Sequence, residues 1–110
     1  MGEEREAMAV PMLTPEQRAG ALEKAAEARR ARASLKHDLA DGRIGLSELL
    51  DRAATDGIAG GLKVEAALVS LPGVGKVKAA RIMEGLGIAD NRRLRGLGAR
   101  QREGLLDALS

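Results

Sequence analysis

Two apolar runs with helical spacing, residues 62–70 and 76–86, flank a glycine turn at residues 71–78, Leu71-Pro72-Gly73-Val74-Gly75-Lys76-Val77-Lys78. Proline fixes φ, and glycine permits positive φ or a close approach of the backbone. A helix that begins at Gly75 or Lys76 leaves its first amide groups unpaired at the positive end of its dipole. Residues 71–78 therefore predict an anion site, which Lys76 and Lys78 reinforce.

Two other glycine loops are excluded at this turn. A P-loop has a glycine five residues before the second glycine and Ser or Thr after the lysine, where Ser70 and Val77 stand. A dinucleotide fingerprint follows a strand and has a third glycine where Lys78 stands. A plain turn between packed helices is the remaining alternative. Because no catalytic set accompanies the turn, we expect the anion to be a nucleic-acid phosphate.

The composition bounds the fold and the chemistry. The chain has 110 residues, enough for one domain, and it contains no Phe, Tyr, Trp or Cys. The core must therefore consist of Leu, Ile, Val, Met and Ala, and disulfides are excluded. Without aromatic rings there is no platform for stacked bases, which argues against the common readers of single-stranded RNA. We see no membrane-spanning run or signal peptide, and expect a cytoplasmic protein.

The sequence contains no residue pattern typical of a catalytic site or a metal site. His37 is the only histidine, and a triad or zinc site needs more partners than it has. The carboxylates are spread along helical segments with no clustered pair. We therefore expect neither an enzyme nor a bound metal or cofactor.

A second basic segment strengthens the nucleic-acid hypothesis. Residues 71–102 carry eight Lys and Arg against two Asp and Glu, although the whole chain has a net charge of only +2. Leu94 and Leu97 can hold this segment on the core while arginines face outward, and Gly98 precedes the last helix. Arginine suits a narrow minor groove. The alternative is a basic loop that only aids solubility. The residues expected to contact phosphate here are Arg92, Arg93, Arg95, Gly96, Gly98 and Arg100.

The chain divides into three parts, and no part shows the alternation of a strand, so the expected class is all-α. Residues 1–13 are expected to be a disordered acidic lead. Thr14, Pro15 and Gln17 start a long helix, within residues 14–42, that stops at Gly42. Residues 43–110 form a helical globule with a short helix at 47–54 inside a glycine-rich connector. Its further helices are expected at 62–70, 76–86 and 99–109, with an arginine-rich loop at 89–98.

The long helix presents opposite charges on opposite sides. At 100° per residue, four basic residues fall within an arc of about 60°: Arg18, Arg29, Arg32 and Lys36. Leu35 and Leu39 can anchor the C-terminal half, whereas the alanine-rich N-terminal half is expected to project from the globule. We interpret the basic arc as a stripe that faces a polyanion. A solvated helix with ion pairs along its own surface is the alternative.

Residues from about 10 to 109 resemble the integration host factors of actinobacteria. The matching stretches are residues 13–18, 21–25, 71–78 and 92–98. The resemblance implies a monomeric, nucleoid-associated protein, with a long helix on a small globule that contains a helix-two-turns-helix motif. Such a protein binds duplex DNA with little sequence preference, bends or compacts it, and assists phage integrases. Residues 71–78 would be one phosphate-contacting site, and the loop from 89 to about 101 a lid over the backbone or minor groove.

Two other functions remain open at this point. A ribosomal or structured-RNA-binding module uses a similar phosphate-binding turn, although this chain lacks a long basic tail. An accessory domain of a nuclease, ligase or glycosylase uses similar helical hairpins, and would need a catalytic partner. Measuring the affinities for duplex DNA and duplex RNA at one salt concentration distinguishes an RNA-binding module from a DNA-binding protein.

Overall fold

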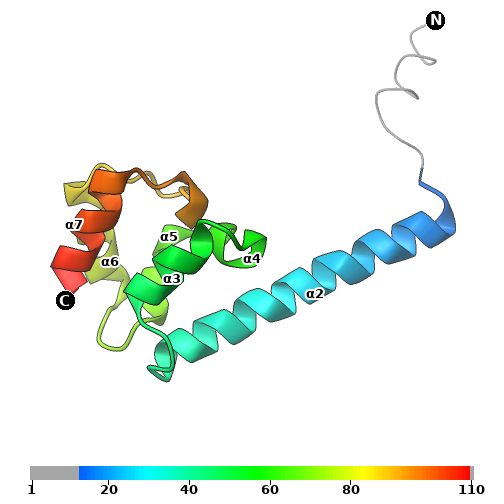
Figure 1. Ribbon diagram of the computed structural model, residues 1–110, viewed down its shortest axis with the longest axis horizontal. Coiled ribbons are helices and arrows are strands. Elements are labelled where there is room, and N and C mark those ends of the chain that lie inside the picture. Colours follow the sequence, from blue (N-terminus) through cyan, green and yellow to red (C-terminus); the bar gives the residue numbers. More distant parts are fainter. Residues whose placement is uncertain (1–12, 110) are drawn as a thin grey trace, which may run out of the picture.

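The structure, a computed structural model, describes residues 13–109. Figure 1 shows a long helix that runs out from a small helical globule, and the described residues form no β-strand. The all-α class and this two-part architecture are thus confirmed. The elements are α2 (Pro15–Ala40), α3 (Leu46–Ala53), α4 (Gly57–Gly60), α5 (Val64–Ser70), α6 (Lys76–Gly85), the 3₁₀ turn η1 (Leu94–Gly96) and α7 (Ala99–Leu109). The expected acidic lead lies outside the described residues, except for Leu13.

Both ends of α2 have the predicted caps. The Thr14 hydroxyl accepts the Gln17 amide at 3.1 Å, and the Gln17 side chain accepts the Thr14 amide at 2.9 Å, which closes a capping box. At the other end Gly42 has a φ of 75°, and its amide donates to the Leu39 carbonyl. The Arg43 amide donates to the Asp38 carbonyl at 2.9 Å, which completes a Schellman motif.

Only the C-terminal half of α2 belongs to the globule. Leu35 and Leu39 are buried and pack α2 against α4 and α5, whereas residues 13–30 are exposed or half-buried throughout. The N-terminal half therefore projects as predicted, and the molecule measures 56 Å along its longest axis against 29 and 25 Å across (Figure 1).

The core is aliphatic, as the composition requires. Its largest fully buried side chains are Leu39, Leu49, Leu68, Leu105 and Val64. The C-terminal end of α6 meets the middle of α7 closely: a Cβ on Gly104 would lie 2.3 Å from the Leu86 Cδ2. Glycine at this position thus allows the last helix to lie against the C-terminal end of α6, next to the arginine-rich segment.

Two short elements were missed by the sequence analysis. The helix α4 lies inside the glycine-rich connector, where the Asp56 carboxylate accepts the Ile58 amide at 2.8 Å and caps it. Glycine has a low helix propensity, which hides such an element from the sequence pattern. Gly60 permits its packing, because a Cβ there would lie 2.8 Å from the Ala53 carbonyl oxygen of α3. The second missed element, η1, is one turn within the arginine-rich loop.

Leu39→Ala is expected to lower the free energy of unfolding by about 2–5 kcal/mol, because it leaves a cavity where α2 meets the globule. The matched control is Leu22→Ala on the same helix, where the leucine is 65% exposed, with an expected change within about 0.5 kcal/mol. Urea denaturation followed by far-UV circular dichroism measures both, since the chain has no Trp or Tyr. Equal effects of the two substitutions would contradict the anchoring of α2 at Leu39.

Candidate nucleic-acid interface

The glycine turn adopts the conformation that its sequence predicts. The Val74 amide donates to the Leu71 carbonyl at 3.2 Å, with Pro72 and Gly73 between them. Gly73 has a φ of 78°, in the left-handed region that favours glycine. Leu71 is half-buried and Val74 is buried, so the turn is held on the core at both ends.

The first amide groups of α6 are free to bind an external acceptor. Gly75 is the N-cap, and the first bond of the helix runs from the Ala79 amide to the Gly75 carbonyl at 2.9 Å. The amides of residues 75–78 have no hydrogen-bond acceptor among the described residues. A Cβ on Gly75 would meet no atom within 4 Å beyond its chain neighbours, so the space before the helix is open. These are the features that an anion site at the positive end of α6 requires.

The side chains around these amides are exposed. Lys76 and Lys78 are exposed and add positive charge beside the helix start. Val77 lies between them and is 67% exposed, one of the few large apolar side chains in contact with solvent. Within the predicted site, residues 71–78, Leu71 and Val74 are thus held on the core. The other residues of the site are exposed.

The arginine-rich segment is bonded to the chain before α5. The Val64 amide donates to the Arg92 carbonyl, and the Leu94 amide donates to the Leu62 carbonyl, both at 2.9 Å. These bonds form an isolated bridge between Lys63 and Arg93. Leu94 is buried and Leu97 half-buried, as predicted, so the segment is fixed on the core by side chains as well as by its backbone.

The three arginines expected to act together have different roles in the structure. The Arg92 guanidinium donates to the Gly96 carbonyl at 2.7 Å, and the Arg93 guanidinium donates to the Gly61 carbonyl. Arg95 is exposed, and its side chain bonds to no other described residue. Two arginines therefore stabilise the loop with part of their donors, while Arg95 keeps all of its donors for a ligand.

The start of α7 repeats the glycine-before-helix arrangement, with one addition. The Gly98 amide donates to the Gln101 side-chain oxygen at 3.1 Å, and the Gln101 side-chain nitrogen donates to the Gly87 carbonyl at 3.3 Å. Gln101 thus joins the start of α7 to the end of α6. The sequence analysis missed this role, although a glutamine three residues after an N-cap is half of a capping box. Arg100, in the first turn of α7, is exposed.

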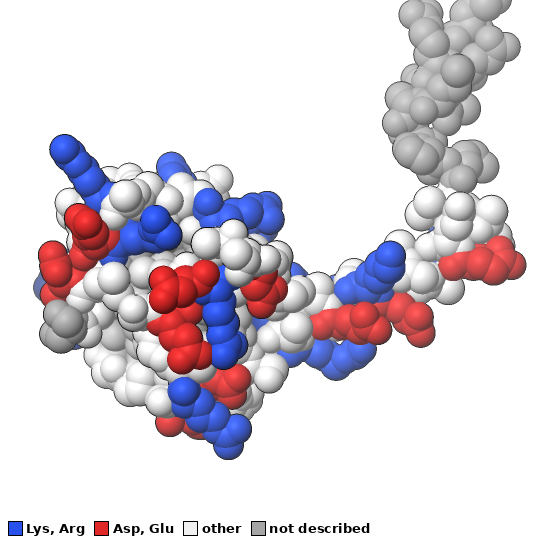
Figure 2. All heavy atoms as spheres, viewed as in Figure 1, with Lys and Arg blue, Asp and Glu red and all other residues white. Residues whose placement is uncertain are grey.

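The basic residues of this surface form no ion pair with another described residue. Among residues 13–109 the structure has one ion pair, Arg52 with Glu48 at 2.7 Å, and both belong to α3. Figure 2 shows acidic side chains over the middle of the globule, around one basic side chain, and at its left edge, with other basic side chains toward the top and bottom. A polyanion would thus approach away from the acidic area around α3.

Within the described residues, no three His, Cys, Asp or Glu side chains come together as a metal site would require. His37 is exposed in the last turn of α2. Within the same residues no helix has the length and apolar character needed to span a membrane.

The comparisons with known proteins agree with this geometry. Residues 39–109 match the S13-like H2TH domain, which places the globule among helix-two-turns-helix proteins. Proteins named integration host factor are 60% identical in Mycolicibacterium smegmatis and 59% identical in Mycobacterium tuberculosis, each over 91% of this chain and 95% of the relative. A Streptomyces coelicolor protein of the same name is 55% identical over 86% of this chain and 88% of its own.

A solved structure described as sIHF bound to an 8 bp palindromic DNA superposes on the chain with a TM-score of 0.77. It is 46% identical and covers 80% of this chain and 99% of its own. The chain therefore belongs to the integration host factor family of mycobacteria and Streptomyces, which confirms the resemblance. The relatives are named as host factors and not as enzymes, in agreement with the expectation that the chain is not an enzyme.

Gly73→Ala is expected to lower the free energy of unfolding by about 1–2 kcal/mol, because a Cβ is strained at positive φ. Gly73→Asn should lower it less, since asparagine tolerates the left-handed region better. Urea titrations of the two variants and the wild type give the order. If alanine proves as stable as glycine, the turn does not adopt this conformation in solution.

Proposed function

We propose that the chain is a monomeric, nucleoid-associated protein that binds duplex DNA through its phosphates, with little sequence preference, and bends and compacts it. The main support is the row of amides at residues 75–78, which have no acceptor among the described residues and lie beside Lys76 and Lys78. Backbone amides and lysines bind phosphate oxygens but read no base, so contacts of this kind position a duplex without sequence selection.

The family supports DNA as the partner. A member of known structure is bound to DNA, and the relatives are named for a role in integration. We therefore extend the proposal to assistance of phage integrases by bending their DNA. A duplex RNA partner is the competing hypothesis, because phosphate contacts alone do not distinguish the two helices.

The proposed contacts are Gly73, Gly75, Lys76 and Lys78 at the first site, and Arg95, Gly98 and Arg100 at the second. The two sites lie on one rigid body. Residue 93 bridges to residue 63 before α5, and Gln101 bonds to Gly87 after α6, so neither site can move far relative to the other. If both bind one duplex, a straight duplex will seldom match their fixed spacing. Bending completes the second set of contacts, at a cost on the order of 1–6 kcal/mol that several arginine–phosphate bonds can offset.

Binding is expected to depend steeply on salt. About five to eight neutralised phosphates give a slope of roughly −4 to −7 for log K against log[salt]. Anisotropy titrations of a labelled 20–30 bp duplex, several scrambled sequences and the matching RNA duplex measure the slope and the preference at once. A slope near zero, or an RNA affinity above the DNA affinity, would contradict the proposal.

Lys76→Glu is expected to weaken duplex binding at least about tenfold at 0.1 M salt, because it removes one phosphate contact and adds a repulsion. Since Lys76 is exposed, the free energy of unfolding should stay within about 0.5 kcal/mol of wild type. The matched control is Lys24→Glu, which makes the same charge change at an exposed position on α2. Equal losses in the two variants would mean that only net charge matters.

The variant Arg95→Ala with Arg100→Ala should reduce bending more than it reduces binding, because residues 73–78 still hold the duplex. Energy transfer between the ends of a doubly labelled duplex, at saturating protein, measures the bend. Arg43→Ala, at an exposed position after α2, is the control and should bend DNA as wild type does. An unchanged end-to-end distance with wild type would refute bending, and full bending by the double variant would assign it to another part of the protein.

A further inference from the structure

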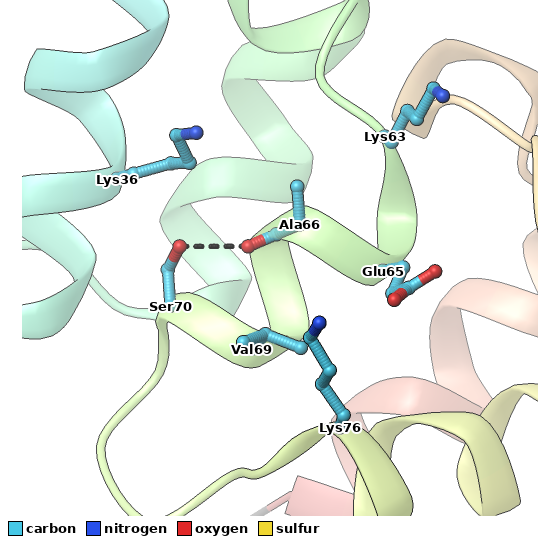
Figure 3. A pocket seen from close by; sticks show the side chains of 7 residues that line it. All are labelled: Lys36, Lys63, Glu65, Ala66, Val69, Ser70 and Lys76. Atoms are coloured by element: carbon cyan, nitrogen blue, oxygen red, sulfur yellow. Dashed lines mark hydrogen bonds between the residues drawn. The ribbon is translucent and has the colours of Figure 1, made fainter.

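A groove lies between the long helix and the globule, beside the glycine turn. It has a volume of about 360 Å³, and its floor consists of Ala66, Val69 and Ser70 of α5. Figure 3 shows three lysines from three different elements around this floor: Lys36 from α2, Lys63 from the segment before α5, and Lys76 from the start of α6.

These lysines keep their charges free. All three are exposed, and none forms an ion pair or a hydrogen bond with another described residue. Glu65 lines the same groove and is half-buried, yet it pairs with none of them. Three like charges around one groove repel one another, and an anion that enters between them relieves this repulsion.

The groove continues two basic features that are already described. Lys76 belongs both to the groove and to the start of α6, so a phosphate chain can pass from one to the other without a gap. Lys36 is the last member of the basic arc of α2, which continues along the helix through Arg32 and Arg29 within about 60° of its circumference.

We propose that this groove is a third phosphate-binding site, which holds the backbone of the duplex bound at residues 73–78 and leads it onto the basic arc of α2. The inference rests on the proposed function. It adds the long helix to the DNA interface and assigns Lys36 and Lys63 as contacts.

A continuous duplex fits this groove better than a small anion does. The three lysine side chains are exposed at its rim and no buried polar side chain points into it, whereas a pocket for a small ligand surrounds the molecule and fixes it with placed polar groups. Lysines on flexible stems suit a phosphate chain that is held by charge rather than by fixed geometry.

The test uses the full chain and a labelled 24 bp duplex, with anisotropy at several salt concentrations. Lys36→Ala with Lys63→Ala should weaken binding at least about tenfold at 0.1 M salt and make the salt slope shallower by about 1.8, the loss of two phosphate contacts. The matched control is Lys24→Ala with Arg30→Ala, which removes the same charge from α2 at positions about 120° around the helix from Lys36 and should leave the slope unchanged. Glu65→Gln should strengthen binding severalfold, whereas Glu27→Gln, about 180° around α2 from Lys36, should not.

Three other outcomes would contradict either the proposed function or the role of the groove. If wild type binds no duplex, the proposed function fails and the groove fails with it. If Lys76→Glu weakens binding while the groove variant equals its control, the proposed function stands and the groove is not a contact. A stoichiometric titration could show that Lys36→Ala with Lys63→Ala loses only a second bound duplex. The groove would then bind a different duplex from the one at residues 73–78, and the proposal of one continuous duplex would be wrong.

Discussion

The arginine-rich segment and the chain before α5 are joined by two backbone hydrogen bonds, and much of the candidate interface depends on them. The Val64 amide bonds to the Arg92 carbonyl and the Leu94 amide to the Leu62 carbonyl. Residues 62–64 lead directly into α5, which ends at the glycine turn, so these bonds connect both proposed contact sites through one short helix. They also place Lys63 at the groove beside α2. Breaking this pairing would leave backbone donors and acceptors without partners, which costs free energy. The pairing therefore keeps the two sites at a fixed spacing.

An interface made of helix ends and of lysine and arginine side chains requires only that the core hold the helices in place. The interior contains only aliphatic side chains, and the largest fully buried ones are four leucines and one valine. Such a core positions short helices, and among residues 13–109 it contains no buried polar or charged side chain. The surface presents helix ends and the side chains of lysine and arginine. These groups suit an extended anion better than a compact substrate.

The sequence predicted the helices with strong caps and the residues with strong local signals. Thr14 and Gln17, Gly42 and Gly73 have the roles that their types suggested, because each acts within a few residues of itself. The helix α4 was missed because its glycines disfavour a helix unless they pack closely, as Gly60 does on α3. The different roles of Arg92, Arg93 and Arg95 depend on which carbonyls fold next to them, and Gly61 is 32 residues away from Arg93 along the chain. No local pattern contains that information.

The projecting half of α2 can be helical only because its other half is anchored. Residues 13–30 bury no side chain, and no ion pair forms along α2, although the alternative interpretation of its charges required such pairs. Starting a helix in water is unfavourable, because the first turn fixes many dihedral angles for one hydrogen bond. Leu35 and Leu39 remove that nucleation cost by holding the C-terminal turns on the globule, and each further residue then adds one hydrogen bond as the helix extends outward. Alanine, glutamate, lysine and arginine favour this extension, and the capping box at Thr14 satisfies the free end. The charges of α2 are thus carried on a helix whose direction is fixed by the same leucines that anchor it on the globule, where Lys36 lines the groove beside α5.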